Sequence, residues 1–143
     1  MTEIYVDADA CPVKDEVVRV AERHKLPVHM ISDGGIRPSR HPLVTTVIVD
    51  QAPDAADDWI AESIATGDIA VTNDILLAVR CIESGAHVIR PNGEILDERS
   101  IGGVLGTRNL MTDLRSAGKI TGGPKAFSKK DRSTFLDFLE RTV

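Results

Sequence analysis

The chain has 143 residues, of which 42% are hydrophobic and 3% aromatic, and its formal net charge is −5 at pH 7. This length favours one domain with its own buried core, and the few aromatic residues argue against a base-stacking platform for single-stranded nucleic acid. No apolar run reaches the roughly 20 residues of a membrane span, the N-terminal stretch is acidic rather than basic, and Cys11 and Cys81 form no C-x-x-C pattern, so we expect a soluble protein of the reducing cytoplasm.

The first half of the chain alternates between strand-like and helical patterns. A β-rich run at residues 4–6 leads to Pro12, which stands where the first residue of a helix is favoured. Apolar residues then recur at helical spacing, and a second strand is predicted at residues 28–31. After a loop rich in glycine and proline, residues 45–49 are nearly all β-branched, which predicts a third strand that is buried on both faces.

The alternation continues in the middle of the chain. Residues 54–67 predict a helix with an acidic first turn, which complements the helix dipole. Strands are predicted at residues 69–71 and 86–89, on either side of a further helix that ends at Gly85. Strands that alternate with helices indicate an α/β protein with a doubly wound, mostly parallel, five-stranded sheet.

The C-terminal part predicts extra helices beyond this sheet. One is expected at residues 105–117, and a last helix is expected to begin at Ser128, where Ser128 and Asp131 have the spacing of a capping box. Neither a repeat nor a linker interrupts the sequence. We therefore predict a single domain over residues 1–143, with a basic helical extension over about residues 104–143.

Acidic residues follow two of the predicted strands. Ligands of an open parallel sheet bind at the carboxyl ends of its strands, where the winding direction reverses. If the first and fourth strands are neighbours there, Asp7 and Asp9 lie opposite Asp74, and the first turn of the middle helix adds Asp57 or Asp58. Each of these residues alone is more typical of a turn or a helix cap, so the hypothesis depends on their convergence.

A cluster of carboxylates is typical of a metal site. Like charges in a partly dry pocket repel one another and raise each other's pKa unless a cation is present. Carboxylate oxygens without accompanying His or Cys favour Mg²⁺ or Mn²⁺ over zinc. Such an ion activates water and stabilises charge on a phosphoryl oxygen, so hydrolysis of a phosphodiester bond is the predicted reaction.

The charge is unevenly distributed along the chain. Residues 1–107 carry nine basic and 18 acidic side chains, whereas residues 108–143 carry eight basic and four acidic ones. A basic segment of this kind either binds a phosphate backbone or forms a solvated surface, and the sequence favours neither. The residues that we assign to nucleic-acid binding are Arg108, Arg115, Lys119, Lys125, Lys129, Lys130 and Arg132.

Four segments together resemble the bacterial YaiI/YqxD family. They are IYVDADACPVK, DAADDWI, GDIAVTNDILLA and RNLMTDLRSAGKITGGPKAFSKKDRSTF. The resemblance runs over nearly the whole chain and implies a PIN-like (NYN-type) nuclease fold. Its acidic pattern falls on Asp7, on Asp57 or Asp58, and on Asp74, with Asp9 as an addition. We assign Asp7, Asp58 and Asp74 to the metal and all five residues to catalysis.

Three functions are compatible with these sequence features. The first is a divalent-metal-dependent nuclease, with RNA favoured over DNA as the substrate. The second is a phosphatase of the haloacid-dehalogenase type, because Asp7-Ala8-Asp9 imitates the D-x-D pair of that class. The third is an RNA-binding or regulatory module that keeps the fold without turnover.

Overall fold

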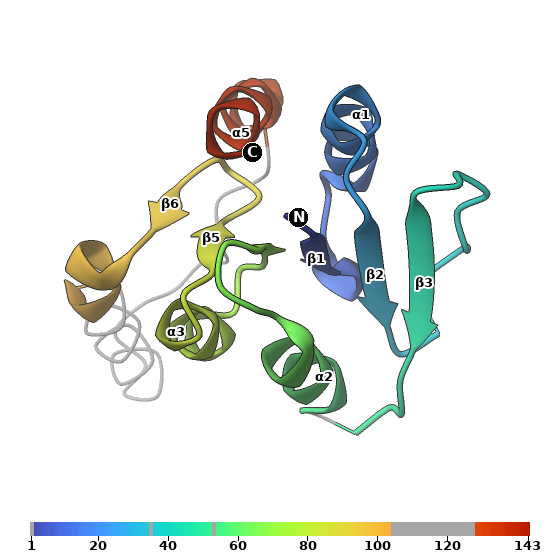
Figure 1. Ribbon diagram of the computed structural model, residues 1–143, viewed down its shortest axis with the longest axis horizontal. Coiled ribbons are helices and arrows are strands. Elements are labelled where there is room, and N and C mark those ends of the chain that lie inside the picture. Colours follow the sequence, from blue (N-terminus) through green and yellow to red (C-terminus); the bar gives the residue numbers. More distant parts are fainter. Residues whose placement is uncertain (1, 35, 53, 104–127) are drawn as a thin grey trace, which may run out of the picture.

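The computed structural model describes residues 2–34, 36–52, 54–103 and 128–143. Helices cover both faces of one six-stranded, mostly parallel sheet in a mixed α/β fold (Figure 1). The strands are β1 (Ile4–Asp7), β2 (Val28–Ser32), β3 (Val44–Ile48), β4 (Ile69–Val71), β5 (His87–Ile89) and β6 (Ile95–Leu96). The helices are the 3-10 helix η1 (Ala8–Ala10), α1 (Lys14–His24), α2 (Ala55–Ser63), α3 (Ile75–Glu83) and α5 (Lys129–Thr142), and residues 98–103 are also helical.

The order of the strands in the sheet is β3-β2-β1-β4-β5-β6. The chain winds outward from β1 to β3, returns to place β4 in parallel beside β1, and then winds toward the other edge. The doubly wound arrangement confirms the sequence prediction. The sheet has six strands, however, whereas five were predicted. The sixth strand, β6, pairs antiparallel with β5 through only two residues. A strand this short gives no detectable period in the sequence.

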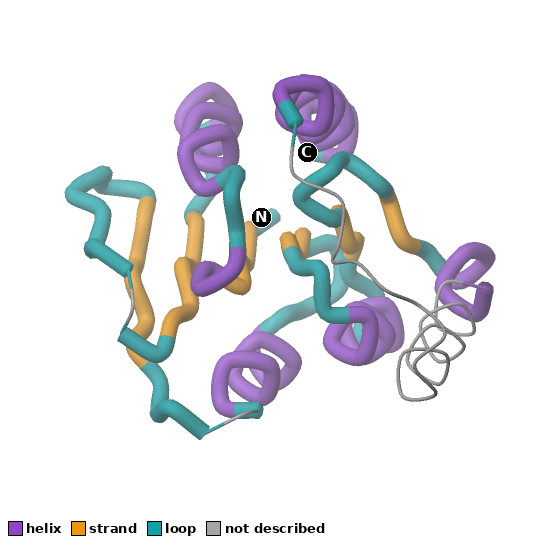
Figure 2. The backbone as a smooth tube through the Cα atoms, turned by 180° about the vertical axis from the view of Figure 1, so that it is seen from behind, coloured by secondary structure: helices purple, strands orange, loops and turns teal. Residues whose placement is uncertain are grey.

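The hydrophobic core has one part on each face of the sheet. In β1, Ile4 and Val6 pack on the side of α1 and α5, whereas Tyr5 packs on the side of α2 and α3. This alternation follows from the period of two along a strand. Figures 1 and 2 show the two helix layers on opposite sides of the sheet. The carboxyl edge of the sheet lies between these layers.

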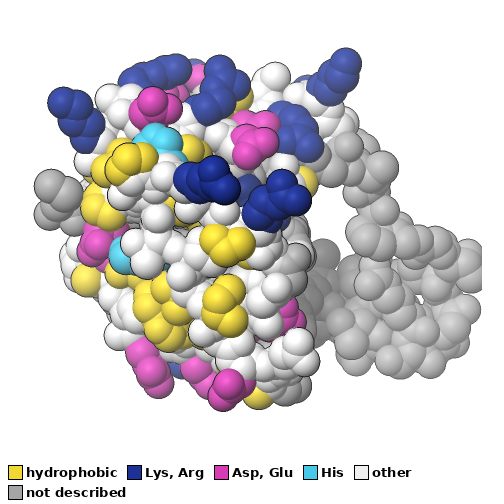
Figure 3. Space-filling model, turned by 90° about the vertical axis from the view of Figure 1, so that its right-hand side faces the viewer, with side chains coloured by type: hydrophobic (Ala, Val, Ile, Leu, Met, Phe, Trp, Pro, Cys, Tyr) yellow, Lys and Arg dark blue, Asp and Glu magenta, His cyan; other side chains and the backbone are white. Residues whose placement is uncertain are grey.

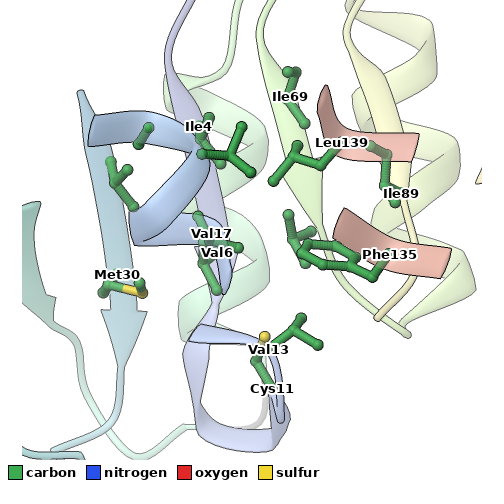
Figure 4. Packing of buried hydrophobic residues seen from close by; sticks show 14 of the residues in the cluster. Ile4, Val6, Cys11, Val13, Val17, Met30, Ile69, Ile89, Phe135 and Leu139 are labelled. Atoms are coloured by element: carbon green, nitrogen blue, oxygen red, sulfur yellow. The ribbon is translucent and has the colours of Figure 1, made fainter. Parts of the chain in front are cut away.

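Helix α5 is an integral part of the core. Its Phe135 and Leu139 are fully buried, and both lie close to Ile69 and Ile89 of the sheet (Figure 4). The predicted capping box is confirmed, because the side chain of Ser128 accepts a hydrogen bond from the backbone of Asp131 and the reciprocal bond is also present. The helix predicted at residues 105–117 lies outside the described residues.

Strand β3 corrects one prediction from the sequence. The strand was expected to be buried on both faces, but it forms an edge of the sheet, and the side chain of Ile48 is 56% exposed. β-Branched residues favour strands at an edge as well as in the centre, so the composition of this segment did not determine its place. Among the described residues, no helix is both long and apolar enough to cross a membrane.

Candidate functional site

The candidate site lies at the carboxyl ends of β1 and β4, where the winding of the sheet reverses. Pairing of Val6 with Val71 places the following residues, Asp7 and Thr72, side by side. A pocket of about 260 Å³ opens at this point, and its acidic lining consists of Asp7, Asp9, Asp33, Asp50, Asp57 and Asp74. The structure thus brings together four of the five acidic residues assigned from the sequence, and Asp58 is the one that it does not include.

Thr72 links two of these carboxylates. Its buried hydroxyl donates a hydrogen bond to Oδ2 of Asp7 at 3.1 Å and accepts one from the backbone N–H of Asp74 at 3.0 Å. Asp74 is the N-cap of α3, and its Oδ1 accepts a hydrogen bond from the backbone N–H of Leu77 at 3.1 Å. These bonds fix Asp7 and Asp74 relative to each other across two neighbouring strands.

Asp57 and Asp74 interact directly in the pocket. The pKa of Asp57 is raised to about 7, first by burial, then by the negative charges of Asp74 and Asp7 and by a hydrogen bond with the carboxylate of Asp74. The pKa of Asp7 is also raised, mainly by burial and further by Asp74 and Asp9, although the hydrogen bond from Thr72 opposes this. The repulsion among these groups shows that their charges are close.

Helical geometry explains why Asp57 and Asp58 face different ways. Asp57 lies three and seven residues before the buried Ile60 and Ile64, which share one face of a helical turn with it. Asp58 is one residue further around α2, where its Oδ1 accepts a hydrogen bond from Nη1 of Arg80 at 2.8 Å. Of the two residues that the sequence offered, Asp57 is the one that α2 contributes to the pocket, whereas Asp58, which we assigned to the metal, lies outside it.

Asp9 organises the backbone beside the pocket. Its Oδ1 accepts a hydrogen bond from the hydroxyl of Ser32 at 2.5 Å, and its Oδ2 accepts one from the backbone N–H of Asp33 at 2.9 Å. The hydroxyl of Ser32 in turn accepts a hydrogen bond from the backbone N–H of Gly34. Both oxygens of Asp9 thus hold the segment that leaves β2, and this role makes Asp9 a support of the pocket wall.

The chemistry of the carboxylates suits a divalent cation, although their oxygen atoms already form hydrogen bonds within the protein. In the described part of the chain, no three His, Cys, Asp or Glu side chains are placed to hold a metal ion as they stand. The side chain of Asp57 is hydrogen-bonded to that of Asp74, and the side chain of Asp7 accepts a hydrogen bond from Thr72. Oxygen donors of this kind are those that Mg²⁺ and Mn²⁺ prefer. Asp7, Asp57 and Asp74 bring such donors to one pocket.

The raised pKa of Asp57 predicts that the metal-free protein loses stability as the pH rises. An aspartate with an ordinary pKa of 3.8 in the unfolded chain and about 7 in the folded protein stabilises the fold most below pH 4, and this contribution disappears as the pH passes 7. We expect Asp57→Asn to raise the free energy of unfolding at pH 8 by on the order of 1 kcal/mol, because Asp57 is only half-buried and solvent screens the repulsion.

Urea unfolding with EDTA at pH 5 and pH 8 checks this prediction. Asp58→Asn is the matched control, because Asp58 lies next in the same helix but outside the pocket. The control should keep the pH dependence of the wild type, whereas Asp57→Asn should weaken it. An equal pH dependence in all three proteins would show that Asp57 does not titrate in this range.

Basic residues surround the carboxyl edge from the side of α1 and α5. Arg132 donates from Nη1 to the carbonyl of Pro12 at 2.8 Å and to Oε1 of Glu16 at 2.9 Å, which ties the start of α5 to the segment after β1. Lys129 and Lys130 are exposed in the same first turn. Arg108, Arg115, Lys119 and Lys125 lie outside the described residues. Figure 3 shows the β3 side of the molecule, with Lys and Arg gathered above, toward α1, together with some Asp and Glu, whereas most charged side chains below, toward α2, are Asp and Glu.

Sequence reasoning missed three residues at this edge. Asp33 and Asp50 follow β2 and β3 and line the pocket, so the rule that led to Asp7 and Asp74 also applied to them. Arg90 follows β5, and its Nε donates a hydrogen bond to Oδ1 of Asn73 at 3.2 Å. Arg90 could have been found by the same rule, because it is a polar residue directly after a strand. A single arginine in a turn, however, does not by itself indicate a functional site.

Comparison with known proteins gives a family but no solved relative. The chain matches the family model described as "Uncharacterized BCR, YaiI/YqxD family" over residues 5–143. It is 61% identical over 143 residues to a UPF0178 protein from Rhodopseudomonas palustris, covering 100% of this chain and 90% of that relative. It is 57% identical over 144 residues to a UPF0178 protein from Roseobacter denitrificans, covering 100% and 95%. No solved structure gives a significant match.

Proposed function

The chain belongs to the YaiI/YqxD family, and we propose that it is a PIN-like, divalent-metal-dependent nuclease that hydrolyses phosphodiester bonds of RNA. The observation that carries this proposal is the convergence of Asp7, Asp57 and Asp74 in one pocket, where burial and the charges of the other two carboxylates raise the pKa of Asp57 to about 7. The position of the pocket at the switch point of a parallel sheet supports it further.

Three of the carboxylates share one role in the proposed reaction, and Asp9 has another. Asp7, Asp57 and Asp74 hold the cation, which is Mg²⁺ or Mn²⁺ and supplies an activated water and charge stabilisation when bound. Thr72 keeps Asp7 oriented through its hydrogen bond. Asp57 loses its proton near neutral pH, so we expect metal binding to strengthen as the pH rises through 7. Asp9 keeps the segment after β2 in place.

The supporting features extend to the rest of the molecule. The basic first turn of α5 lies beside Pro12, close to the end of β1, and offers charge complementary to a phosphate backbone. Both cysteines are free and buried, which is the state expected in a reducing compartment, and we propose the cytoplasm as the location.

Cleavage of an end-labelled single-stranded RNA with Mg²⁺, Mn²⁺ or EDTA tests the proposal. We expect cleavage with either metal and none with EDTA. Asp57→Asn should lower kcat/KM by about 100-fold or more, because it removes the negative charge of a metal ligand, which is worth several kcal/mol. Asp58→Asn should remain within about threefold of the wild type, since its carboxylate binds Arg80 outside the pocket.

Three other outcomes would contradict the proposal in different ways. RNA binding that survives EDTA, without cleavage under any metal, would indicate a non-catalytic RNA-binding module. Cleavage of DNA but not of RNA would show that the substrate is DNA. A covalent aspartyl phosphate at Asp7 would indicate the phosphatase instead, because the proposed nuclease attacks with water.

A further inference from the structure

Arg90 lies in line with the carboxylate pocket along the edge of the sheet. Val6 pairs with Val71, and Val71 pairs with Ile89, so the residues that follow them form a row across three neighbouring strands. This row consists of Asp7, Thr72 and Arg90. The backbone N–H of Thr72 donates to the carbonyl of Ile89 at 3.3 Å, which continues the pairing to the end of β5. Two strand spacings separate Asp7 from Arg90, or about 10 Å between their backbones.

The guanidinium of Arg90 is held in place without being fully used. Its Nε donates to Oδ1 of Asn73 at 3.2 Å, and its Nη1 donates to Oε2 of Glu94 at 3.0 Å. Nη2 has no hydrogen-bond partner among the residues that the structure describes, and the side chain is 27% exposed. Asn73 directly precedes Asp74 in the chain. Nη2 of Arg90 is therefore available to bind a ligand. The guanidinium is held by Asn73, which is the neighbour in sequence of the pocket residue Asp74.

The negative charge of the pocket opposes the binding of RNA unless a cationic residue such as Arg90 lies beside it. Six aspartates line it, and a polyanionic strand that approaches them is repelled unless cations lie along its path. Arginine suits this task because its planar fork binds two oxygens of one phosphate and stays charged at all relevant pH values. Glu94 now occupies part of the fork, so phosphate binding must compete with an ion pair that is partly exposed to solvent.

We propose that Arg90 binds a phosphate of the RNA strand next to the one that is cleaved, and so makes the site selective for oligonucleotides over isolated phosphodiesters. This proposal rests on the nuclease function proposed above. It assigns a cationic group on the β5 side of the site. The basic first turn of α5 lies beside Pro12, and α5 also packs against the turn at Gly93 that follows Arg90.

Binding of a fluorescent single-stranded RNA oligonucleotide in EDTA, titrated with salt, tests Arg90 without requiring cleavage. Arg90→Gln should weaken binding about tenfold and reduce the slope of log K against log salt by about 0.7, the value for one lost phosphate contact on a single strand. Glu94→Gln should act in the opposite direction and strengthen binding about threefold, because it releases the guanidinium. Arg141→Gln is the control, since Arg141 also forms an exposed i,i+4 ion pair but lies in the last turn of α5.

The outcomes separate this inference from the nuclease proposal. Equal affinities and slopes for wild type, Arg90→Gln and Glu94→Gln would overturn the role of Arg90, whether or not RNA is cleaved. A wild type that binds no RNA would overturn it as well. A wild type that binds RNA but cleaves none would overturn the nuclease and leave Arg90 to be judged from the binding data. Where cleavage occurs, Arg90→Gln should raise KM for RNA and leave hydrolysis of bis(p-nitrophenyl) phosphate unchanged, a difference that a merely structural defect would not produce.

Discussion

Asp7→Asn is expected to lower RNA cleavage at least 1,000-fold and to abolish detectable binding of Mn²⁺. Asp7 is the last residue of β1 and lines the acidic pocket, where burial raises its pKa and Asp74 and Asp9 raise it further. An asparagine there still accepts the hydrogen bond from Thr72, so the fold should persist. The variant removes the charge that a divalent cation needs, and the loss of several kcal/mol of metal interaction corresponds to this change in rate.

Asp50→Asn is the matched control for this prediction. Asp50 lines the same pocket and carries the same charge, but it follows β3 rather than β1 or β4. Calorimetric titration with Mn²⁺ and RNA cleavage on the same samples should show a change of threefold or less. If Asp50→Asn and Asp7→Asn lose equal activity, the pocket attracts cations by its overall charge and Asp7 has no special role.

Gly93→Ala is expected to lower the free energy of unfolding by about 3 kcal/mol. Gly93 has a φ of +93° in the turn between β5 and β6, and a Cβ there would lie 2.6 Å from Cγ2 of Thr134 and 2.9 Å from the backbone nitrogen of Phe135. The added carbon meets the backbone of α5, which cannot move without disturbing the buried Phe135. Left-handed strain contributes about 1 kcal/mol and overpacking about 2 kcal/mol.

Gly67→Ala separates these two contributions. Gly67 has a similar φ of +87°, but a Cβ there meets nothing within 4 Å. Urea unfolding should show that Gly67→Ala lowers the free energy of unfolding by only about 1 kcal/mol. For Gly93→Ala, the larger loss should correspond to a fall in Tm of about 10 °C. Equal losses in the two variants would mean that α5 does not pack against the turn that carries Arg90.

The fold was largely predictable because its signals are local and repeated. Alternation of β-branched runs with helical patterns predicted β1 to β5, and the adjacency of β1 and β4 follows from the habit of doubly wound sheets. The place of β3 at an edge was not predictable from its composition, since β-branched residues suit both positions. Strand β6 was missed because two residues cannot show a period.

The site was predictable to the level of the segment but not of the side chain. The rule that polar residues after parallel strands converge was sufficient to place Asp7, Asp9 and Asp74 in one pocket. The choice between Asp57 and Asp58 required knowing which face of α2 is buried. The spacing of Asp57 to Ile60 and Ile64 contained that information. The engagement of Asp9 with Ser32 and Asp33 depends on tertiary contacts and could not be derived from spacing.

Calorimetric titration of the wild-type protein with Mn²⁺ at pH 8, in the absence of RNA, tests the metal site most directly. At this pH Asp57 is largely deprotonated, so the three carboxylates are free to bind a cation. We expect one site that binds Mn²⁺ below millimolar concentration and that binds it more weakly at pH 6, where the cation must displace a proton. No binding up to several millimolar Mn²⁺ at pH 8 would contradict this expectation.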